Sequence, residues 1–117
     1  MFEKNLNISL LLDFYGDILT ERQKDMLDFY YNDDLSLAEI ADNYDISRQG
    51  VRSVLKKGEN ILINMEEKLH LAERFSSVQE KSSKIASELE EISRHINNEE
   101  ISAKIIALIE QIKELAD

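Results

Sequence analysis

The sequence contains no cysteine, no proline and no tryptophan, and it has only three glycines. Without cysteine, the chain can form neither a disulfide nor a thiolate metal site. Because helix breakers are scarce and Leu, Ile, Glu and Lys are abundant, the composition favours long helices over strands. A chain of 117 residues can bury one modest hydrophobic core. We therefore expect an all-α protein.

Long apolar runs are also missing. Near the N-terminus the longest uninterrupted apolar stretch is residues 10–12, whereas a membrane span needs about 20 residues. Neither a basic flank nor a small-residue cleavage site marks a signal peptide. The sequence predicts a cytoplasmic protein without a membrane span.

Positive charge is in short supply, and it is unevenly placed. The chain has 14 Lys and Arg against 24 Asp and Glu, which gives a net charge of −10. Residues 47–57 nevertheless hold four basic side chains and no acidic one, while the segments before and after them are both acidic. An acidic chain repels nucleic acid, so this basic segment is the one place where nucleic acid could bind.

Four helices are predicted in the first half of the chain. An apolar stripe indicates a helix over residues 3–15. Thr20 and Ser36, each followed three residues later by Gln or Glu, form capping boxes that begin the second and third helices. Ser47 caps the fourth.

The third and fourth of these helices have the pattern of a helix-turn-helix, over about residues 36–57. Asp45 falls at the turn, where a residue that tolerates a left-handed backbone is needed. Small or apolar residues fall where the two helices would touch, namely Leu37, Ile40 and Ala41 in the first and Val51, Val54 and Leu55 in the second.

The polar residues of the fourth helix are the candidate nucleic-acid contacts. At about 100° per residue, most of them fall on the side opposite Val51. Arg can pair with guanine and Gln with adenine, a serine at a helix N-terminus can contact phosphate, and lysines can contact the backbone as point charges. The alternative is a helical hairpin whose polar face happens to be basic. The candidates are Ser47, Arg48, Gln49, Arg52, Ser53, Lys56 and Lys57.

No pattern indicates catalysis. His70 and His95 are far apart and lack the spacing of metal ligands. The sequence has no glycine-rich phosphate loop and no nucleophile motif. We expect a binding protein that is not an enzyme and needs no metal or cofactor.

The second half of the chain has an apolar stripe with three- and four-residue spacing, as in a coiled coil. It runs from Ile61 to Ile96 and, after a break at Asn97 and Asn98, again from Ile101 to Leu115. We expect a helix-turn-helix domain over residues 1–60 and a coiled-coil-like helical extension over 61–117. The extension either forms a homodimer or folds back as a hairpin within one chain, and the length of the stripe favours the homodimer.

The segment Leu35 to Ala41, together with Ile46-Ser47-Arg48 and Val51-Arg52, resembles the promoter-reading region 4 of bacterial sigma factors. Residues 1–75 are similar also to the YlxM family, small helix-turn-helix proteins linked to the signal recognition particle. The residues that carry this resemblance are Leu12-Asp13-Phe14-Tyr15, Leu19-Thr20, Arg22-Gln23, Tyr30-Tyr31, Asp33-Asp34, Ser47-Arg48-Gln49 and Glu67-Lys68-Leu69.

The resemblance implies a nucleic-acid-binding accessory or regulatory protein of the signal recognition particle pathway. Such a protein would contact the particle's RNA or protein. Two alternatives stay open: a helical protein-interaction module, in which the acidic helices dock onto a basic partner, and a transcriptional regulator that binds DNA.

Overall fold

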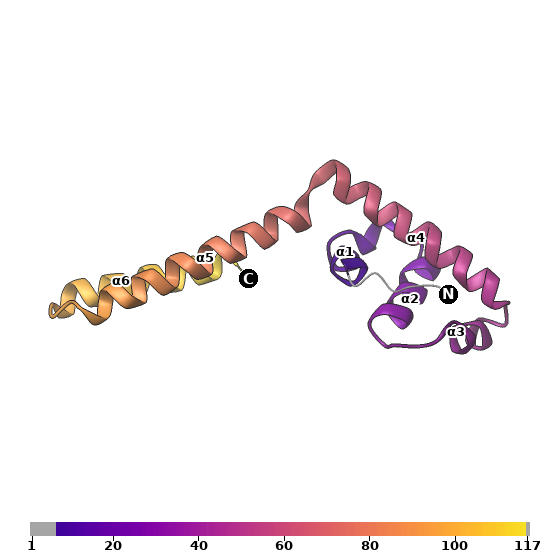
Figure 1. Ribbon diagram of the computed structural model, residues 1–117, viewed down its shortest axis with the longest axis horizontal. Coiled ribbons are helices and arrows are strands. Elements are labelled where there is room, and N and C mark those ends of the chain that lie inside the picture. Colours follow the sequence, from indigo (N-terminus) through magenta and orange to yellow (C-terminus); the bar gives the residue numbers. More distant parts are fainter. Residues whose placement is uncertain (1–6, 117) are drawn as a thin grey trace. The chain divides into compact units, whose positions relative to one another are not determined.

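The computed structural model describes residues 7–116, and over these residues the chain is all-α, as predicted (Figure 1). None of the described helices is both long enough and apolar enough to cross a membrane. Of the first predicted helix, the part before residue 7 lies outside the described residues. The helices are α1 (Asn7–Tyr15), the 3-10 helix η1 (Gly16–Ile18), α2 (Glu21–Tyr31), α3 (Leu37–Tyr44), α4 (Arg48–Leu69), α5 (Leu71–Arg94) and α6 (Glu99–Glu114).

Both predicted capping boxes are present. The Thr20 hydroxyl accepts the backbone N–H of Gln23 at 3.2 Å, and the Gln23 side chain accepts the N–H of Thr20 at 3.1 Å. Ser36 and Glu39 form the same reciprocal pair at 3.1 and 3.2 Å. Each box satisfies two N–H groups that the first turn of a helix leaves without an internal partner. The starts of α2 and α3 are therefore fixed by local sequence.

The chain divides into two compact units, residues 1–72 and 73–117. The boundary expected after residue 60 falls inside α4, because the helix-turn-helix unit uses this helix beyond that point. Leu62 is completely buried in the core of the first unit, and Ile61 and Met65 pack against that core. The expectation that the stripe starting at Ile61 needs a partner chain is wrong for this first part of it.

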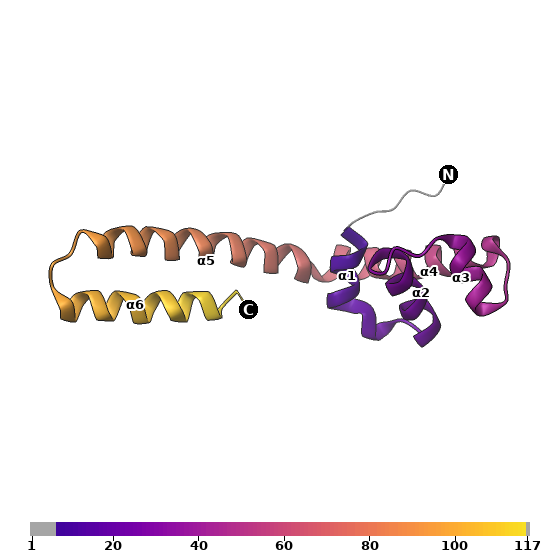
Figure 2. The same cartoon turned by 90° about the horizontal axis from the view of Figure 1, so that it is seen from below.

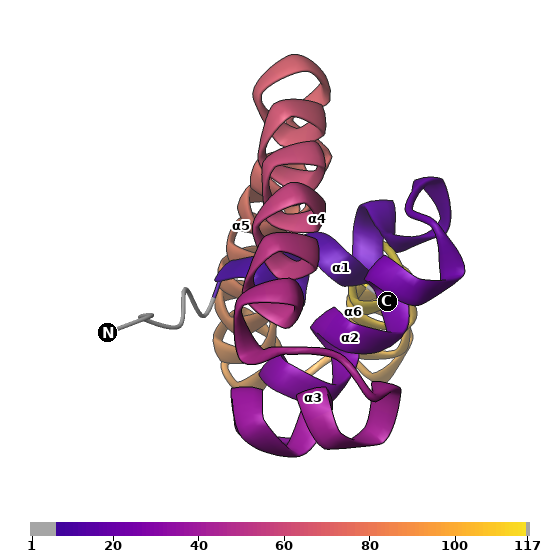
Figure 3. The same cartoon turned by 90° about the vertical axis from the view of Figure 1, so that its right-hand side faces the viewer.

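The first unit is built around α4, whose inner face packs against α1, α2 and α3 (Figure 3). Val51, Leu55 and Leu62 on this face are completely buried. They belong to one apolar cluster with fully buried residues of the three other helices, namely Ile8, Met26, Leu27 and Ile40. Burial of about 1.5–3 kcal/mol per large apolar side chain makes this cluster the main source of stability in the unit.

Tyr15 ties α1 to the junction between α4 and α5. Its hydroxyl donates to Oε1 of Glu66 at 2.6 Å and accepts the backbone N–H of Leu71 at 3.1 Å. The same Glu66 oxygen accepts the N–H of Ala72 at 3.0 Å. Between the two helices His70 has φ 56°, in the left-handed region. The apolar stripe predicted from Ile61 to Ile96 is interrupted at His70, and the sequence did not indicate this break, because the contacts that hold it come from α1.

The second unit is an antiparallel hairpin of α5 and α6 (Figure 2). The predicted break at Asn97 and Asn98 is present, and Asn98 caps α6 by accepting the N–H groups of Glu100 and Ile101 at 3.0 and 3.2 Å. Ala86 of α5 and Ile109 of α6 are buried. Of the two arrangements that the sequence left open, this one chain forms the folded-back hairpin. A helical extension is thus confirmed.

Gly58 sets how closely α4 approaches α2. A Cβ atom built on Gly58 would lie 2.7 Å from Cδ1 of Leu27, closer than real Cβ contacts come. Leu27 is completely buried, so its side chain has no free volume into which it could move. The inner face of α4 therefore needs a residue without a side chain at this position.

We expect Gly58→Ala to destabilise the protein by about 1–3 kcal/mol, because overpacking in the core outweighs the gain in helix propensity of about 1 kcal/mol. Gly50→Ala, on the same helix, is the matched control. Its Cβ would lie 3.3 Å from the Ser47 hydroxyl oxygen and 3.4 Å from Cδ1 of Ile46, so stability should change by less than about 1 kcal/mol. Urea unfolding measures both.

Adding Leu27→Val to Gly58→Ala tests the cause. The double variant should lose less stability than the sum of the two single losses, because the smaller side chain makes room for the new methyl group. Strictly additive losses would mean that Leu27 is not what crowds Gly58.

Candidate nucleic-acid interface

The turn of the helix-turn-helix is held by the last residues of α3. Asp45 takes the left-handed conformation that the sequence predicted, with φ 53° and ψ 47°. The N–H of Ile46 donates to the carbonyl of Ala41 at 3.1 Å, and the N–H of Asp45 donates to that of Asp42 at 3.4 Å. These are the two hydrogen bonds of a Schellman motif, which ends a helix and redirects the chain at once. Only two residues, Ile46 and Ser47, therefore separate Asp45 from α4.

Tyr44 holds α3 against α2. Its ring lies 6.5 Å from that of Phe29, centroid to centroid, and the guanidinium of Arg22 lies 5.4 Å above it. Burial raises the pKa of the Tyr44 hydroxyl, and the nearby carboxylate of Asp25 raises it further. Tyr44 directly precedes the turn residue Asp45 in the sequence. Its stacking partners on α2 required the tertiary structure.

Ser47 caps the start of α4, as predicted. Its hydroxyl oxygen accepts the N–H of Gly50 at 3.0 Å. The hydroxyl proton remains available to donate, since a serine oxygen can accept one hydrogen bond while its O–H donates another. The cap and a phosphate contact are therefore compatible.

The structure leaves the side chains of all the candidate residues exposed, while it buries the opposite side of α4. With Val51 at zero and about 100° per residue, Gln49, Arg52 and Lys56 fall on the outer side, and so does Ser53. Arg48 and Lys57 fall on the two flanks. The exposed candidates are Ser47, Arg48, Gln49, Arg52, Ser53, Lys56 and Lys57, and we call this surface the basic face.

Glu59 borders the basic face, and sequence reasoning passed over it. It lies about 80° from Val51 on α4, is half-buried, and accepts a hydrogen bond from the Tyr31 hydroxyl. Burial raises the pKa of Glu59, although the Tyr31 hydrogen bond and the nearby charge of Lys56 both lower it. An acid on the flank of an otherwise apolar helix face was the signal that could have identified it.

The raised pKa of Glu59 makes stability depend on pH. Because the folded protein holds this proton more tightly than the unfolded chain does, the contribution of Glu59 to stability falls as the pH rises from the ordinary glutamate pKa of 4.5 through the folded pKa. Glu59→Gln carries no titrating group, and its amide oxygen can still accept from Tyr31. We expect this variant to gain stability relative to the natural protein as the pH rises over that window.

Urea unfolding at several pH values measures the difference between the two proteins, and subtraction removes the contribution of the other carboxylates. Glu67→Gln is the control, because Glu67 is exposed on the same helix. A difference between the natural protein and Glu59→Gln that stays constant with pH would contradict the assignment.

Among residues 7–116, no three His, Asp or Glu side chains gather closely enough to hold a metal ion. His70 lies at the α4–α5 junction, whereas His95 follows the last residue of α5.

Comparison with known proteins agrees with this geometry. Over residues 2–114 the chain matches the family model of UPF0122, "Putative helix-turn-helix protein, YlxM / p13 like". It is 40% identical over 115 residues to a UPF0122 protein of Acetivibrio thermocellus, covering 96% of this chain and 98% of the relative. It is 38% identical over 115 residues to one of Shouchella clausii, covering 98% and 99%. To a UPF0122 protein of Clostridium kluyveri it is 46% identical over 78 residues, covering 67% and 70%.

The match to the family extends well beyond the helix-turn-helix and includes nearly all of the α5–α6 hairpin. The resemblance to YlxM proteins that the sequence indicated over residues 1–75 is confirmed and lengthened. This chain belongs to the UPF0122 family of YlxM / p13-like helix-turn-helix proteins.

Proposed function

We propose that this protein binds nucleic acid through the basic face of α4 and acts as an accessory or regulatory protein of the signal recognition particle pathway. The observation that carries the proposal is the separation of the two sides of α4. One side is buried in the core, and the other presents the only segment of the chain with a clear excess of positive charge.

The residues of the basic face suit contacts to both bases and phosphates. Arg52 can form two hydrogen bonds with a guanine edge and Gln49 can do so with adenine, if α4 enters a groove as a recognition helix. Lys56 and Lys57 can neutralise phosphates, which positions the protein without reading sequence. Ser47 can donate to a phosphate at the start of α4.

Four positive charges allow only modest affinity on a chain of net charge −10. If all four contact phosphates of duplex DNA, log affinity should fall with log salt with a slope of roughly −3.6. A homodimer belongs to the proposal, because two copies would present two basic faces. The particle's RNA and DNA are both found in the cytoplasm of a bacterium, where we propose that the protein acts by binding and not by catalysis.

Replacing Arg48, Arg52 and Lys56 together by Ala should weaken binding to the particle's RNA and to a promoter-like duplex, and should flatten the salt dependence. Each lost phosphate contact should remove roughly 0.9 from the slope on duplex DNA and about 0.7 on single strands. Fluorescence anisotropy over a salt series measures both quantities.

The matched control replaces Lys68, Lys84 and Arg94 by Ala. These three are also exposed and lie outside the basic face, so the net charge changes by the same amount. An unchanged slope in the first variant, or an equal loss in both, would contradict the proposal. If this protein retains purified particle protein and neither nucleic acid, the protein-interaction module is favoured. If it prefers the duplex to the particle's RNA, a transcriptional regulator is favoured.

A further inference from the structure

The hairpin leaves an unusual set of apolar side chains in contact with water. Val78, Ile85 and Ile92 of α5 recur every seven residues, and so do Ile101 and Leu108 of α6 and Leu115, the residue that caps its end. All six are between 42% and 68% exposed. Single exposed apolar residues are common, but a regular series of them marks an interaction surface.

The two series lie on the same face of the hairpin. At about 100° per residue, each is rotated by roughly 80–120° in the same sense from the buried positions, Ala86 in α5 and Ile109 in α6. Because α5 and α6 run antiparallel, rotations of equal size and sense about each helix's own axis lead to the same face of the hairpin. The six residues of these two series therefore form one continuous surface, which we call the apolar ribbon.

The ribbon is arranged in three levels. Each level holds one residue before and one residue after the connection between α5 and α6, equally far in sequence from its middle, so the two lie at the same height along the antiparallel hairpin. The levels are about 10 Å apart, as a rise of 1.5 Å per residue requires. The pairs are Ile92 with Ile101, Ile85 with Leu108 and Val78 with Leu115.

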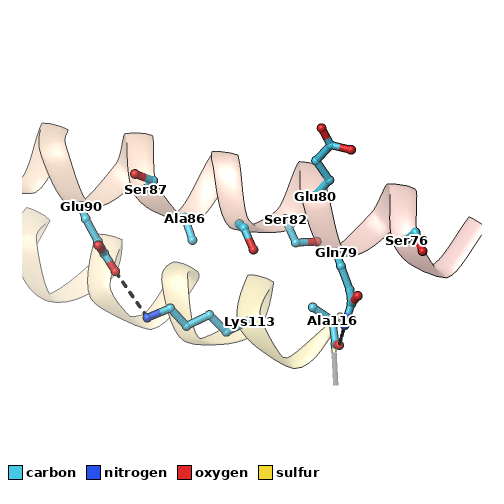
Figure 4. Close-up of a pocket in the computed structure, with 10 residues that line it drawn as sticks. Ser76, Gln79, Glu80, Ser82, Ala86, Ser87, Glu90, Lys113 and Ala116 are labelled. Carbon is cyan, nitrogen blue, oxygen red and sulfur yellow. Dashed lines mark hydrogen bonds and ion pairs between the residues drawn. The ribbon is translucent and has the colours of Figure 1, made fainter. Parts of the chain in front are cut away.

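The opposite face of the hairpin is mostly polar, with Ile106 as an exposed apolar residue on it. There a groove of about 850 Å³ lies between the helices, lined by small and polar residues that include Ser76, Ser83 and Ser87. Figure 4 shows this groove, with Lys113 of α6 and Glu90 of α5 joined across it at 3.3 Å. The hairpin as a whole is thus amphipathic, and water-facing polar groups distinguish this side from the ribbon.

We propose that the ribbon is covered by the ribbon of a second copy of this chain, related by a two-fold axis, so that two hairpins form a four-helix bundle. A partner that buries the ribbon must present apolar rows on two helices with the same seven-residue spacing. A second copy of this chain has such rows. Closed two-fold symmetry is also the usual arrangement for identical chains. This inference deepens the homodimer of the proposed function by assigning its interface, and it does not depend on nucleic-acid binding.

Charge beside the ribbon supports a second copy as the partner. Lys81 and Glu88 are exposed on the outer edge of α5, a few residues before and after Ile85 in the middle level. A two-fold axis at this level that lies between the two ribbons and is perpendicular to α5 makes the two α5 helices antiparallel. Lys81 of each copy then faces Glu88 of the other, which forms two equivalent ion pairs and disfavours partners of other charge patterns.

The test is the mass of the full chain in solution by sedimentation equilibrium. We expect about twice 13.6 kDa for the natural protein, and the single-chain mass for Ile85→Glu. Ser83→Glu is the matched control, because Ser83 is exposed on the same helix and faces the polar groove, and it should remain dimeric. Circular dichroism should show unchanged helix content for both, since both side chains are already exposed. A single-chain mass for the natural protein would overturn the proposal, as would a dimer that survives Ile85→Glu.

A charge exchange tests the identity of the partner without altering the apolar residues. Lys81→Glu and Glu88→Lys should each raise the dissociation constant of the dimer about tenfold, because each creates two like-charge contacts. The double variant should return it to within about threefold of the natural value, because the pairs are restored with reversed signs. Failure of the double variant to recover would overturn this pairing. If the natural protein has the single-chain mass and still binds nucleic acid, the dimer is rejected and the basic face stands.

Discussion

Val51, Leu55 and Leu62 lie along one side of α4 and are removed from water when α1, α2 and α3 pack against them. The remaining geometry of the first unit depends on this burial. Once the inner side of α4 is committed to the core, its rotation about its own axis is fixed, because any turn would expose large apolar side chains at about 1.5–3 kcal/mol each. The close approach at Gly58 removes the remaining freedom, since it sets the distance between α4 and α2.

The basic face is a consequence of that fixed rotation. A helix shows one side outward when its other side is buried, and in α4 the outward side holds Gln49, Arg52 and Lys56. Residues 47–57 contain no acidic residue, so positive charge is not mixed with negative charge along the first half of α4. The one exception at its border is Glu59, whose contact with Tyr31 and partial burial draw it toward the core. Packing and charge separation thus have the same origin.

The helices of the hairpin also have apolar residues at three- and four-residue spacing, but they bury only part of them. A helix with apolar residues over a wide angle cannot bury them all against one neighbour, because one antiparallel partner covers only part of its circumference. Ala86 and Ile109 are buried between α5 and α6, while Ile85 and Leu108, one position away in each helix, stay exposed. The width of the apolar stripe, and not its length alone, is what leaves these apolar side chains of the second unit exposed.

The sequence by itself determined the local features, because their causes lie within a few residues. The capping boxes at Thr20 and Ser36, the left-handed turn at Asp45, the cap at Ser47 and the break at Asn98 each depend on side chains that bond to nearby backbone groups. The exposure of all the candidate residues of the basic face followed from helical periodicity for the same reason.

What only the tertiary structure decided involves residues far apart in the chain. The end of α4 at His70 depends on Tyr15 of α1, through hydrogen bonds to Glu66 and Leu71. The sequence could not place the domain boundary at residue 72, because whether Leu62 belongs to a core or to a seam depends on which helices fold over it. A periodic pattern states which side of a helix is apolar, but the partner that covers that side is chosen by packing in three dimensions.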